Sequence, residues 1–347
     1  MATNLATKYH DQLIMAFTKE SLVKGLLDNE VSFLGAKTVR LTFPQTVAMN
    51  SYKRTGTNRY GTPMEMQDTI QDLTMTQDRS FSLTIDKGNY NDQMLMKKAG
   101  AMLKLQISER AVPEYDLYVF TKLAQKAGTV VGGEPLTKEN IVDRISTATE
   151  FLDDKEIPQD SRMLFVNSGT YKLLRHSPEF LAVDKLAEAS LTKGMVGEYD
   201  NMKVIKVPKS RFPAGLNFIV VHKKSATAPI KISETHLHQD PPGLSGHLLE
   251  GREYYDCFIY APRAYGVYAD VDNTVATVCE APAIASNGAL TSETTGVKFY
   301  YTIDGSDPRY SSTAMQGASA YASSGTTVKA YCTKTDAYDS PVAEHKF

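Results

Sequence analysis

The sequence predicts an α+β protein that carries a small all-β domain at its C-terminal end. Three patterns support this prediction: helical spacing of apolar residues over 91–128, strand-like alternation on both sides of that run, and a change of composition near Ala281. The chain has 347 residues, enough for two or three domains that each bury a core. We place the domain boundary between residues 278 and 279.

Composition and charge exclude several classes of protein. The net charge is −2 and basic residues are dispersed, so no basic surface is predicted for reading nucleic acid. The three cysteines, Cys257, Cys279 and Cys332, form neither a disulfide framework nor a metal-ligand pattern, which favours reduced thiols in a cytosol. No signal peptide begins the chain, and its apolar runs are too short to cross a bilayer. The sequence predicts a soluble protein without membrane contact.

The longest predicted element is a helix over residues 91–128. Asn91 is a good N-cap, and Gly128 is a plausible stop signal. Pro113 lies inside the pattern, so a kink or break is expected near residues 110–112. A helix of this length would span roughly 55 Å at 1.5 Å per residue, and other elements would pack along it as a spine.

The segment before the spine contains an N-terminal arm and a long hairpin. Residues 1–34 have apolar residues at roughly helical spacing, which indicates either an arm that docks on another subunit or a helix packed on its own domain. Residues 37–43 and 76–86 alternate as strands, and a polar stretch at 50–63 lies between them. A loop this long inside a compact domain is usually functional or disordered, and a solvated surface hairpin is the other interpretation.

Residues 129–270 are predicted to form a mixed domain. A helix follows Thr137, with Asn140 in position to complete its cap. Helix and strand alternate irregularly, which favours α+β over a doubly wound parallel sheet. The predicted strands are 162–166, 202–207, 216–221 and 229–232, with a final pair at 253–261 and 265–271. After Ala281, alternating strands at 297–303 and 326–332 predict a small β-sandwich.

No catalytic set or cofactor site is predicted. His236 and His238 share one side of a strand and His247 follows, so a metal site is conceivable, but exposed loop histidines are the favoured interpretation. Residues 304–308 resemble a calcium loop without its final acid, and we predict a turn held by aspartate side chains instead. We therefore expect a protein that is not an enzyme and binds no cofactor.

Three stretches of the sequence carry a family resemblance: 31–39 (VSFLGAKTV), 60–63 (YGTP) and 77–89 (QDRSFSLTIDKGN). The last of these leads into residues 91–94 at the start of the predicted spine. Together with the order arm, hairpin, spine and mixed domain, they resemble the major capsid proteins of tailed phages, the Hong Kong ninety-seven fold. The resemblance implies an N-arm at 1–35, an extended loop at 36–88, a peripheral domain at 89–135 and 252–278, and an axial domain at 136–251. It leaves residues 279–347 as an appended domain.

The resemblance implies a structural protein that self-assembles, as pentamers and hexamers, into an icosahedral shell around phage DNA. Expected partners are other copies of the chain, a separate scaffolding protein, a portal and non-specifically packaged DNA; the protein would be assembled in the host cytoplasm and reside in the virion. No lysine, asparagine and acid match the cross-linking motif of some family members. The subunit-interface residues that we predict are Phe17, Leu22, Lys53, Arg54, Arg59, Tyr60, Glu65 and Asp68.

The C-terminal stretch at 297–308, with residues 327–330, resembles the small immunoglobulin-like domain of chitobiases and hexosaminidases. On a capsid such a domain would sit outside as a decoration, and glycan binding through Tyr300, Tyr301, Tyr310 or Tyr321 is a hypothesis. Two alternatives stay open. One is an encapsulin-like nanocompartment shell around a cargo enzyme, and the other is a carbohydrate-binding accessory protein organised around this C-terminal domain.

Overall fold

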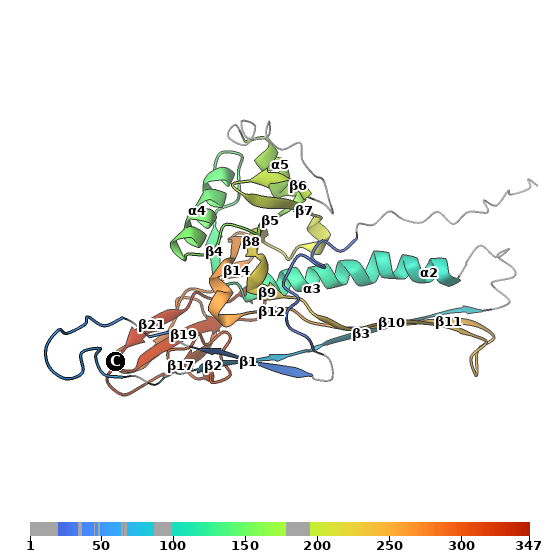
Figure 1. Cartoon of the computed structure of the whole chain (residues 1–347). Helices are drawn as coiled ribbons and strands as arrows, with labels where there is room; N and C mark the ends of the chain where they lie inside the picture. Colours follow the sequence, from blue (N-terminus) through green and yellow to red (C-terminus); the bar gives the residue numbers. More distant parts are fainter. Residues whose placement is uncertain are drawn as a thin grey trace, which may run out of the picture.

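The structure is a computed structural model that describes residues 20–33, 37–44, 46–47, 49–63, 65, 68–86, 99–177 and 195–347. Figure 1 shows a mixed domain standing over a long helix and a long, narrow sheet, which run side by side away from it. The extended loop and the C-terminal domain lie together on the opposite side of the molecule (Figure 1).

The spine consists of α2 (Ala99–Gln106), the π-helical segment η1 (Ile107–Ala111) and α3 (Val112–Gln125). The helix is irregular close to the predicted position, but it does not break: the π-helical segment ends at Ala111, just before Val112 and Pro113, and the ribbon continues into α3 (Figure 1). Proline has no N–H and its ring clashes with the carbonyl of residue i−4, and a π-helical turn accommodates both constraints. The predicted cap at Asn91 lies outside the described residues.

The predicted stop at Gly128 is wrong in its detail. The helix ends at Gln125, with Lys126 as C-cap, and Gly128 directly precedes β4 (Thr129–Gly133). Glycine is required there for a different reason: a Cβ atom on Gly128 would lie 2.2 Å from the carbonyl oxygen of Ala264. The residue therefore permits a close approach of two backbones.

The hairpin predicted from residues 37–43 and 76–86 is also wrong in its pairing, although both strands are present. β1 (Thr38–Pro44) pairs antiparallel with β2 (Asp68–Thr74), a strand that the sequence analysis missed. β3 (Gln77–Asp86) instead pairs with β11 (Gly246–Tyr255), which also pairs with β10 (Ile230–Gln239). Residues 230–250, predicted to belong to the axial domain, thus form a sheet that runs beside the spine (Figure 1).

The axial part is built on a six-stranded sheet in the order β4-β13-β8-β5-β7-β6. Its other strands are β5 (Arg162–Asn167), β6 (Met195–Tyr199), β7 (Met202–Val207), β8 (Leu216–His222) and β13 (Val267–Asp272). The strands expected at 162–166, 202–207 and 216–221 are confirmed. The pair expected at 253–261 and 265–271 is not formed, because β12 (Phe258–Ile259) pairs with β9 (Ala226–Thr227). The 3-10 helix η5 (Ala261–Gly266) carries the chain into β13, which pairs with β4 and β8.

The two faces of this sheet bury separate cores. On one face Phe165 packs against Phe120 of α3, with ring centroids 5.1 Å apart. On the other face its neighbours Leu164 and Val166 pack with residues of α4 (Ile141–Asp154). The helix α5 (Ser168–Arg175) follows β5, capped by Asn167, whose side chain accepts a hydrogen bond from the Thr170 N–H at 2.8 Å.

The cap predicted before α4 is confirmed. The Asn140 side chain accepts from the Thr137 N–H at 2.8 Å, and the Thr137 hydroxyl accepts from the Asn140 N–H at 3.4 Å. Two short 3-10 helices, η3 (Lys209–Arg211) and η4 (Lys223–Ser225), flank β8.

The C-terminal domain is all-β. Its main sheet has the order β18-β17-β19-β21, formed by Met315–Gln316, Lys298–Thr302, Thr327–Thr333 and Ala343–Lys346, and the two predicted strands are among these. Its shorter strands are β14 (Thr277–Val278), β15 (Ala283–Ile284), β16 (Leu290–Thr291) and β20 (Ala337–Tyr338). Leu290, Val328 and Ala330 are among the few buried apolar residues of its own small core.

Candidate assembly surfaces

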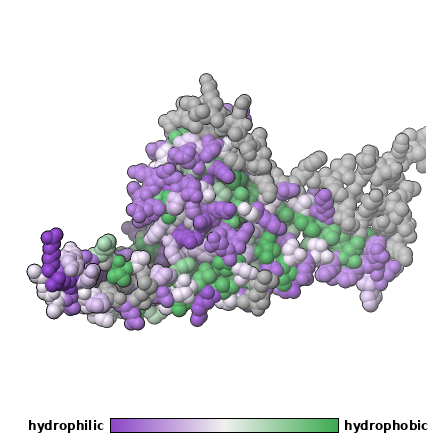
Figure 2. Space-filling model, viewed as in Figure 1, coloured by the Kyte–Doolittle hydropathy of each residue, from purple (hydrophilic) through white to green (hydrophobic). Residues whose placement is uncertain are grey.

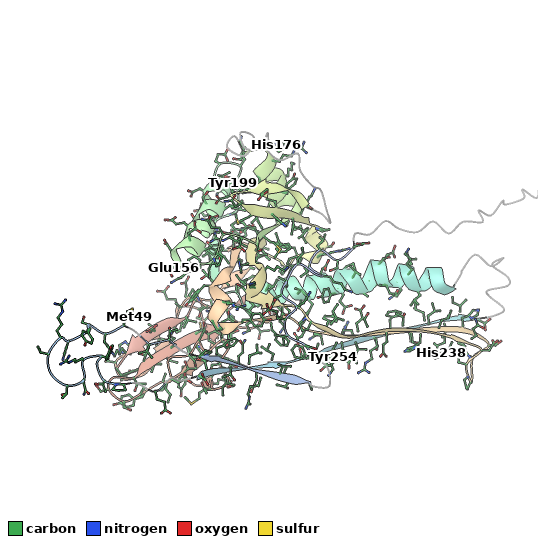
Figure 3. All side chains as sticks on the ribbon, viewed as in Figure 1. Met49, Glu156, His176, Tyr199, His238 and Tyr254 are labelled. Atoms are coloured by element: carbon green, nitrogen blue, oxygen red, sulfur yellow. The ribbon has the colours of Figure 1, made fainter. Side chains whose placement is uncertain are left out.

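The outer part of the extended loop has no core beneath it. Met49, labelled in Figure 3 at the opposite end of the molecule from His238, is 99 % exposed, and Tyr60 is 85 % exposed. The loop is nevertheless ordered by its own contacts: the Lys53 N–H donates to the Arg59 carbonyl at 2.9 Å, and the rings of Tyr52 and Tyr60 meet edge to face. The loop projects from the domain, has a defined conformation and exposes apolar side chains. These properties are typical of a surface that another molecule covers.

Most of the predicted interface residues lie on this loop. Lys53, Arg54, Arg59 and Tyr60 are exposed at its outer end, whereas Glu65 and Asp68 are exposed where the loop returns to β2. The loop therefore presents a basic end and an acidic base. Phe17 lies outside the described residues.

Leu22 is placed differently from the other predicted interface residues. It is 3 % exposed and joins the core of its own chain, together with Val23 and Leu27, against α3. Residues 20–28 form turns rather than a helix. Residues 20–28 therefore pack on their own chain, as in the second of the two interpretations of the N-terminal segment, although they are not helical.

A buried carboxylate holds this segment in place. Asp116 of α3 is fully buried and accepts hydrogen bonds from the Ser21 hydroxyl at 2.6 Å and the Leu22 N–H at 3.1 Å. Arg211 donates to the same carboxylate at 2.8 Å and to the Glu20 carbonyl at 2.9 Å. Because breaking a buried ion pair leaves an uncompensated charge, this cluster fixes the point at which the N-terminal segment meets the spine.

A second buried carboxylate fixes the junction of the extended loop. Asp256 accepts from both the N–H and the hydroxyl of Thr76, at 2.8 and 2.9 Å, and from the Tyr118 hydroxyl at 2.7 Å. Thr76 lies between β2 and β3, and Tyr118 belongs to α3. Asp256 thus ties the point where the loop strands turn into the long sheet to the spine.

The base of the loop is also attached to η5. The side chain of Gln71, in β2, donates to the Ile259 carbonyl at 2.8 Å and accepts from the Ala261 N–H at 3.0 Å. Sequence reasoning missed both Gln71 and Asp256. Each is a polar residue within or beside a strand. The sequence alone cannot distinguish a buried polar residue at such a position from an exposed one.

The candidate metal residues do not form a metal site. His236 and His238 lie on β10, not on a loop, and their rings stack 6.0 Å apart. Each has an exposed glutamate nearby, at 3.7 Å for His236 and Glu234 and at 3.4 Å for His238 and Glu250. Over the described ranges, no group of three or more histidine, cysteine, aspartate or glutamate residues is arranged to hold a metal ion.

The turn at residues 304–308 is held by aspartate side chains, as predicted. Asp304 accepts from the Ser306 N–H at 3.0 Å and from the Thr313 hydroxyl at 2.7 Å. Asp307 accepts from the Arg309 N–H at 2.9 Å and from the Arg309 side chain at 2.7 Å.

Comparison with solved structures identifies the fold. A structure from Mycobacterium phage Che8 superposes with a TM-score of 0.64 at 16% identity, covering 78% of this chain and 98% of that chain. The capsid structure of the cyanophage P-SCSP1u has a TM-score of 0.62 at 11% identity, covering 78% and 93%. The head structure of Helicobacter pylori bacteriophage KHP40 has a TM-score of 0.60 at 12% identity, covering 78% and 95%.

The chain has the fold of phage capsid proteins. The predicted fold class, α+β with a capsid arrangement, is confirmed. Residues 289–347 match the family model described as Fn3 associated, which fits the immunoglobulin-like domain predicted for the C-terminal end. A comparison with curated protein sequences finds no match.

Two further findings bear on the predicted classes. Among the described residues, no helix combines the length and apolar character needed to span a membrane. The comparisons give no support to the nanocompartment or to the carbohydrate-binding accessory protein.

Proposed function

We propose that this chain is a major capsid protein, which self-assembles into the icosahedral head shell that encloses phage DNA. The observation that carries the proposal is the fold, which matches a phage capsid structure and a phage head structure over 78% of the chain. Its role is structural and requires no catalytic step. The virion is its proposed location, after assembly in the host cytoplasm.

Contacts between copies would come from the extended loop. Its exposed basic end, Lys53, Arg54 and Arg59, and its exposed Tyr60 offer charge and aromatic surface to a neighbouring subunit. Glu65 and Asp68 at the base supply the opposite charge. Such complementarity sets which surfaces meet and in which register, while the buried area of many contacts stabilises the shell. A separate scaffolding protein, a portal and non-specifically held DNA complete the proposed set of partners.

Negative-stain electron microscopy of the purified protein, together with sedimentation, tests this proposal. Closed shells, or free pentamers and hexamers, are the expected result. Empty particles support a capsid, whereas a co-purified enzyme inside them would point to a nanocompartment. A chain that stays monomeric even when it is co-expressed with the scaffolding protein of its phage would overturn the proposal.

The four tyrosines named as candidate glycan contacts differ in exposure. Tyr310 packs at the end of α3, Tyr300 stacks on Tyr331, and Tyr301 packs on the domain core. Tyr321 is 72 % exposed, with its ring edge to face with Phe347. We propose that any glycan contact involves Tyr321, and a glycan array with the full chain and its Tyr321→Ala variant tests this.

A further inference from the structure

The end of the spine helix is covered by the C-terminal domain. The helix ends at Gln125, and the carbonyls of residues 126–128, which follow it, need hydrogen-bond partners because this turn is largely buried. The Tyr310 hydroxyl donates to the Lys126 carbonyl, and the Arg309 guanidinium donates to the Ala127 carbonyl at 2.8 Å and the Gly128 carbonyl at 3.0 Å. Two adjacent residues of one domain therefore satisfy three successive carbonyls of the other.

Arg309 is held rigidly for this task. Its side chain is 3% exposed and forms a forked pair with Asp307, through Nη2 at 2.7 Å and Nε at 3.1 Å. A forked arginine–carboxylate pair fixes orientation as well as charge. Loss of the guanidinium would leave a carboxylate and two carbonyls without these donors in a buried place.

Further contacts join the two domains around this anchor. The Lys126 ammonium lies 2.7 Å from the carboxylate of Asp339, which is 8% exposed. The ring of Tyr338 belongs to the core that contains α3, and its hydroxyl donates to the Ala214 carbonyl at 3.0 Å. Part of the C-terminal domain is thus buried in the core of the capsid part.

The same edge of the domain also meets the base of the extended loop. The Ser312 hydroxyl lies 3.5 Å from the Ile70 carbonyl of β2. A groove between the two parts is lined by Phe43, Pro44 and Thr69 of the hairpin and by residues 304–307 of the domain. Figure 1 shows β17, β19 and β21 beside the segment from which the loop projects.

We propose that the C-terminal domain is a clamp that holds the end of the spine and the base of the extended loop, and that assembly requires it. The domain is then a working part of the capsid subunit and not a dispensable decoration. The requirement for assembly rests on the proposed capsid function. The clamp does not, because it can be tested on the free subunit.

The experiment compares Tyr310→Phe and Arg309→Lys with the wild type as full chains. The first removes one hydroxyl, and the second keeps the charge but loses the fork. Tyr321→Phe is the matched control, since it removes a hydroxyl from an exposed ring of the same domain. Circular dichroism verifies folding, hydrogen exchange reports on peptides covering 124–130, 38–44 and 68–74, and sedimentation measures the fraction of subunits in shells.

Both anchor variants are expected to exchange several-fold faster in these peptides and to form several-fold fewer shells, while Tyr321→Phe matches the wild type. Wild-type exchange in the anchor variants would overturn the clamp. Faster exchange with undiminished shell formation would overturn its role in assembly. If the wild type forms no shell under any condition, the capsid function fails, while the exchange data still test the clamp.

Discussion

At the scale of single residues, buried polar groups occupy the junctions of this fold. Asp116 joins the N-terminal segment to the spine, Asp256 joins the loop to the spine, and Arg309 joins the C-terminal domain to the helix end. Each has several partners that come from distant parts of the chain. Such groups cost more when unpaired than they contribute when paired, so they select one arrangement of the parts.

His222 is a residue-scale source of pH dependence. Its ring is buried at the end of β8, where it accepts a hydrogen bond from the Lys224 N–H at 3.3 Å. Burial, and the nearby charge of Arg162, lower the pKa of His222 below its ordinary value of 6.5. His222 therefore binds more protons in the unfolded chain than in the folded chain once the pH falls below about 6.5. Its effect is to decrease the free energy of unfolding as the pH falls from that value to the folded pKa.

We expect the melting temperature of wild-type subunits to fall as the pH is lowered through this window. His222→Gln, which cannot be protonated but keeps an acceptor, should flatten the dependence. His236→Gln, at an exposed position of β10, is the control and should leave it unchanged. Thermal denaturation followed by circular dichroism at several pH values makes the measurement. An equally steep dependence in His222→Gln would contradict the assignment.

At the scale of elements, we expect the outer part of the extended loop to contribute to assembly but little to the stability of the folded subunit. Residues 49–63 make backbone contacts with one another, whereas β1 and β2 below them are held by Gln71 and by their mutual pairing. Removal of the loop end should therefore leave the subunit folded. The free energy of unfolding should change by about 1 kcal/mol or less, because closing a shorter loop alters chain entropy only slowly.

We predict that deletion of residues 48–66, with a short Gly-Ser connection, gives folded subunits that do not form normal shells. Circular dichroism and urea denaturation check the fold, and electron microscopy checks assembly. Lys53→Ala/Arg54→Ala/Arg59→Ala in the intact loop is a milder companion variant and should weaken assembly at low salt. The difference from the wild type should shrink at high salt, because salt already screens these charges in the wild type. Normal shells from the deletion would refute the interlocking role of the loop.

The sequence predicts the positions of several strands but not which strands pair with each other. Alternation identified β1, β3, β17 and β19, because a strand with one buried face repeats every two residues. It could not identify partners: β3 pairs with β11, which lies far along the chain. β2 was missed since its sequence, DTIQDLT, has only two strongly apolar residues and buries a glutamine instead. Asp256 and Arg309 act through contacts that no local pattern contains.

At the scale of the whole molecule, hydrophilic and apolar surface lie over different parts of the fold. Figure 2 shows a mainly hydrophilic surface over the side of the mixed domain that carries α4, while apolar surface follows the spine and the long sheet. His238 marks the part of that sheet furthest from the loop, so the two projecting parts extend in opposite directions (Figure 3). In the shell that we propose, a chain of this shape would reach neighbours on both sides.

The shared core has a consequence for unfolding of the entire chain. Tyr338 and Tyr310 pack into the core that contains α3, and the Arg309 anchor crosses the same boundary. The C-terminal domain therefore cannot separate without exposing part of the main core. We therefore expect differential scanning calorimetry of the free subunit to give one unfolding transition, with equal calorimetric and van't Hoff enthalpies. Arg309→Lys should lower that transition or split it, whereas Tyr321→Phe should leave it in place. Two separate transitions in the wild type would mean that the domain is thermodynamically independent, and that its polar contacts with the spine contribute little.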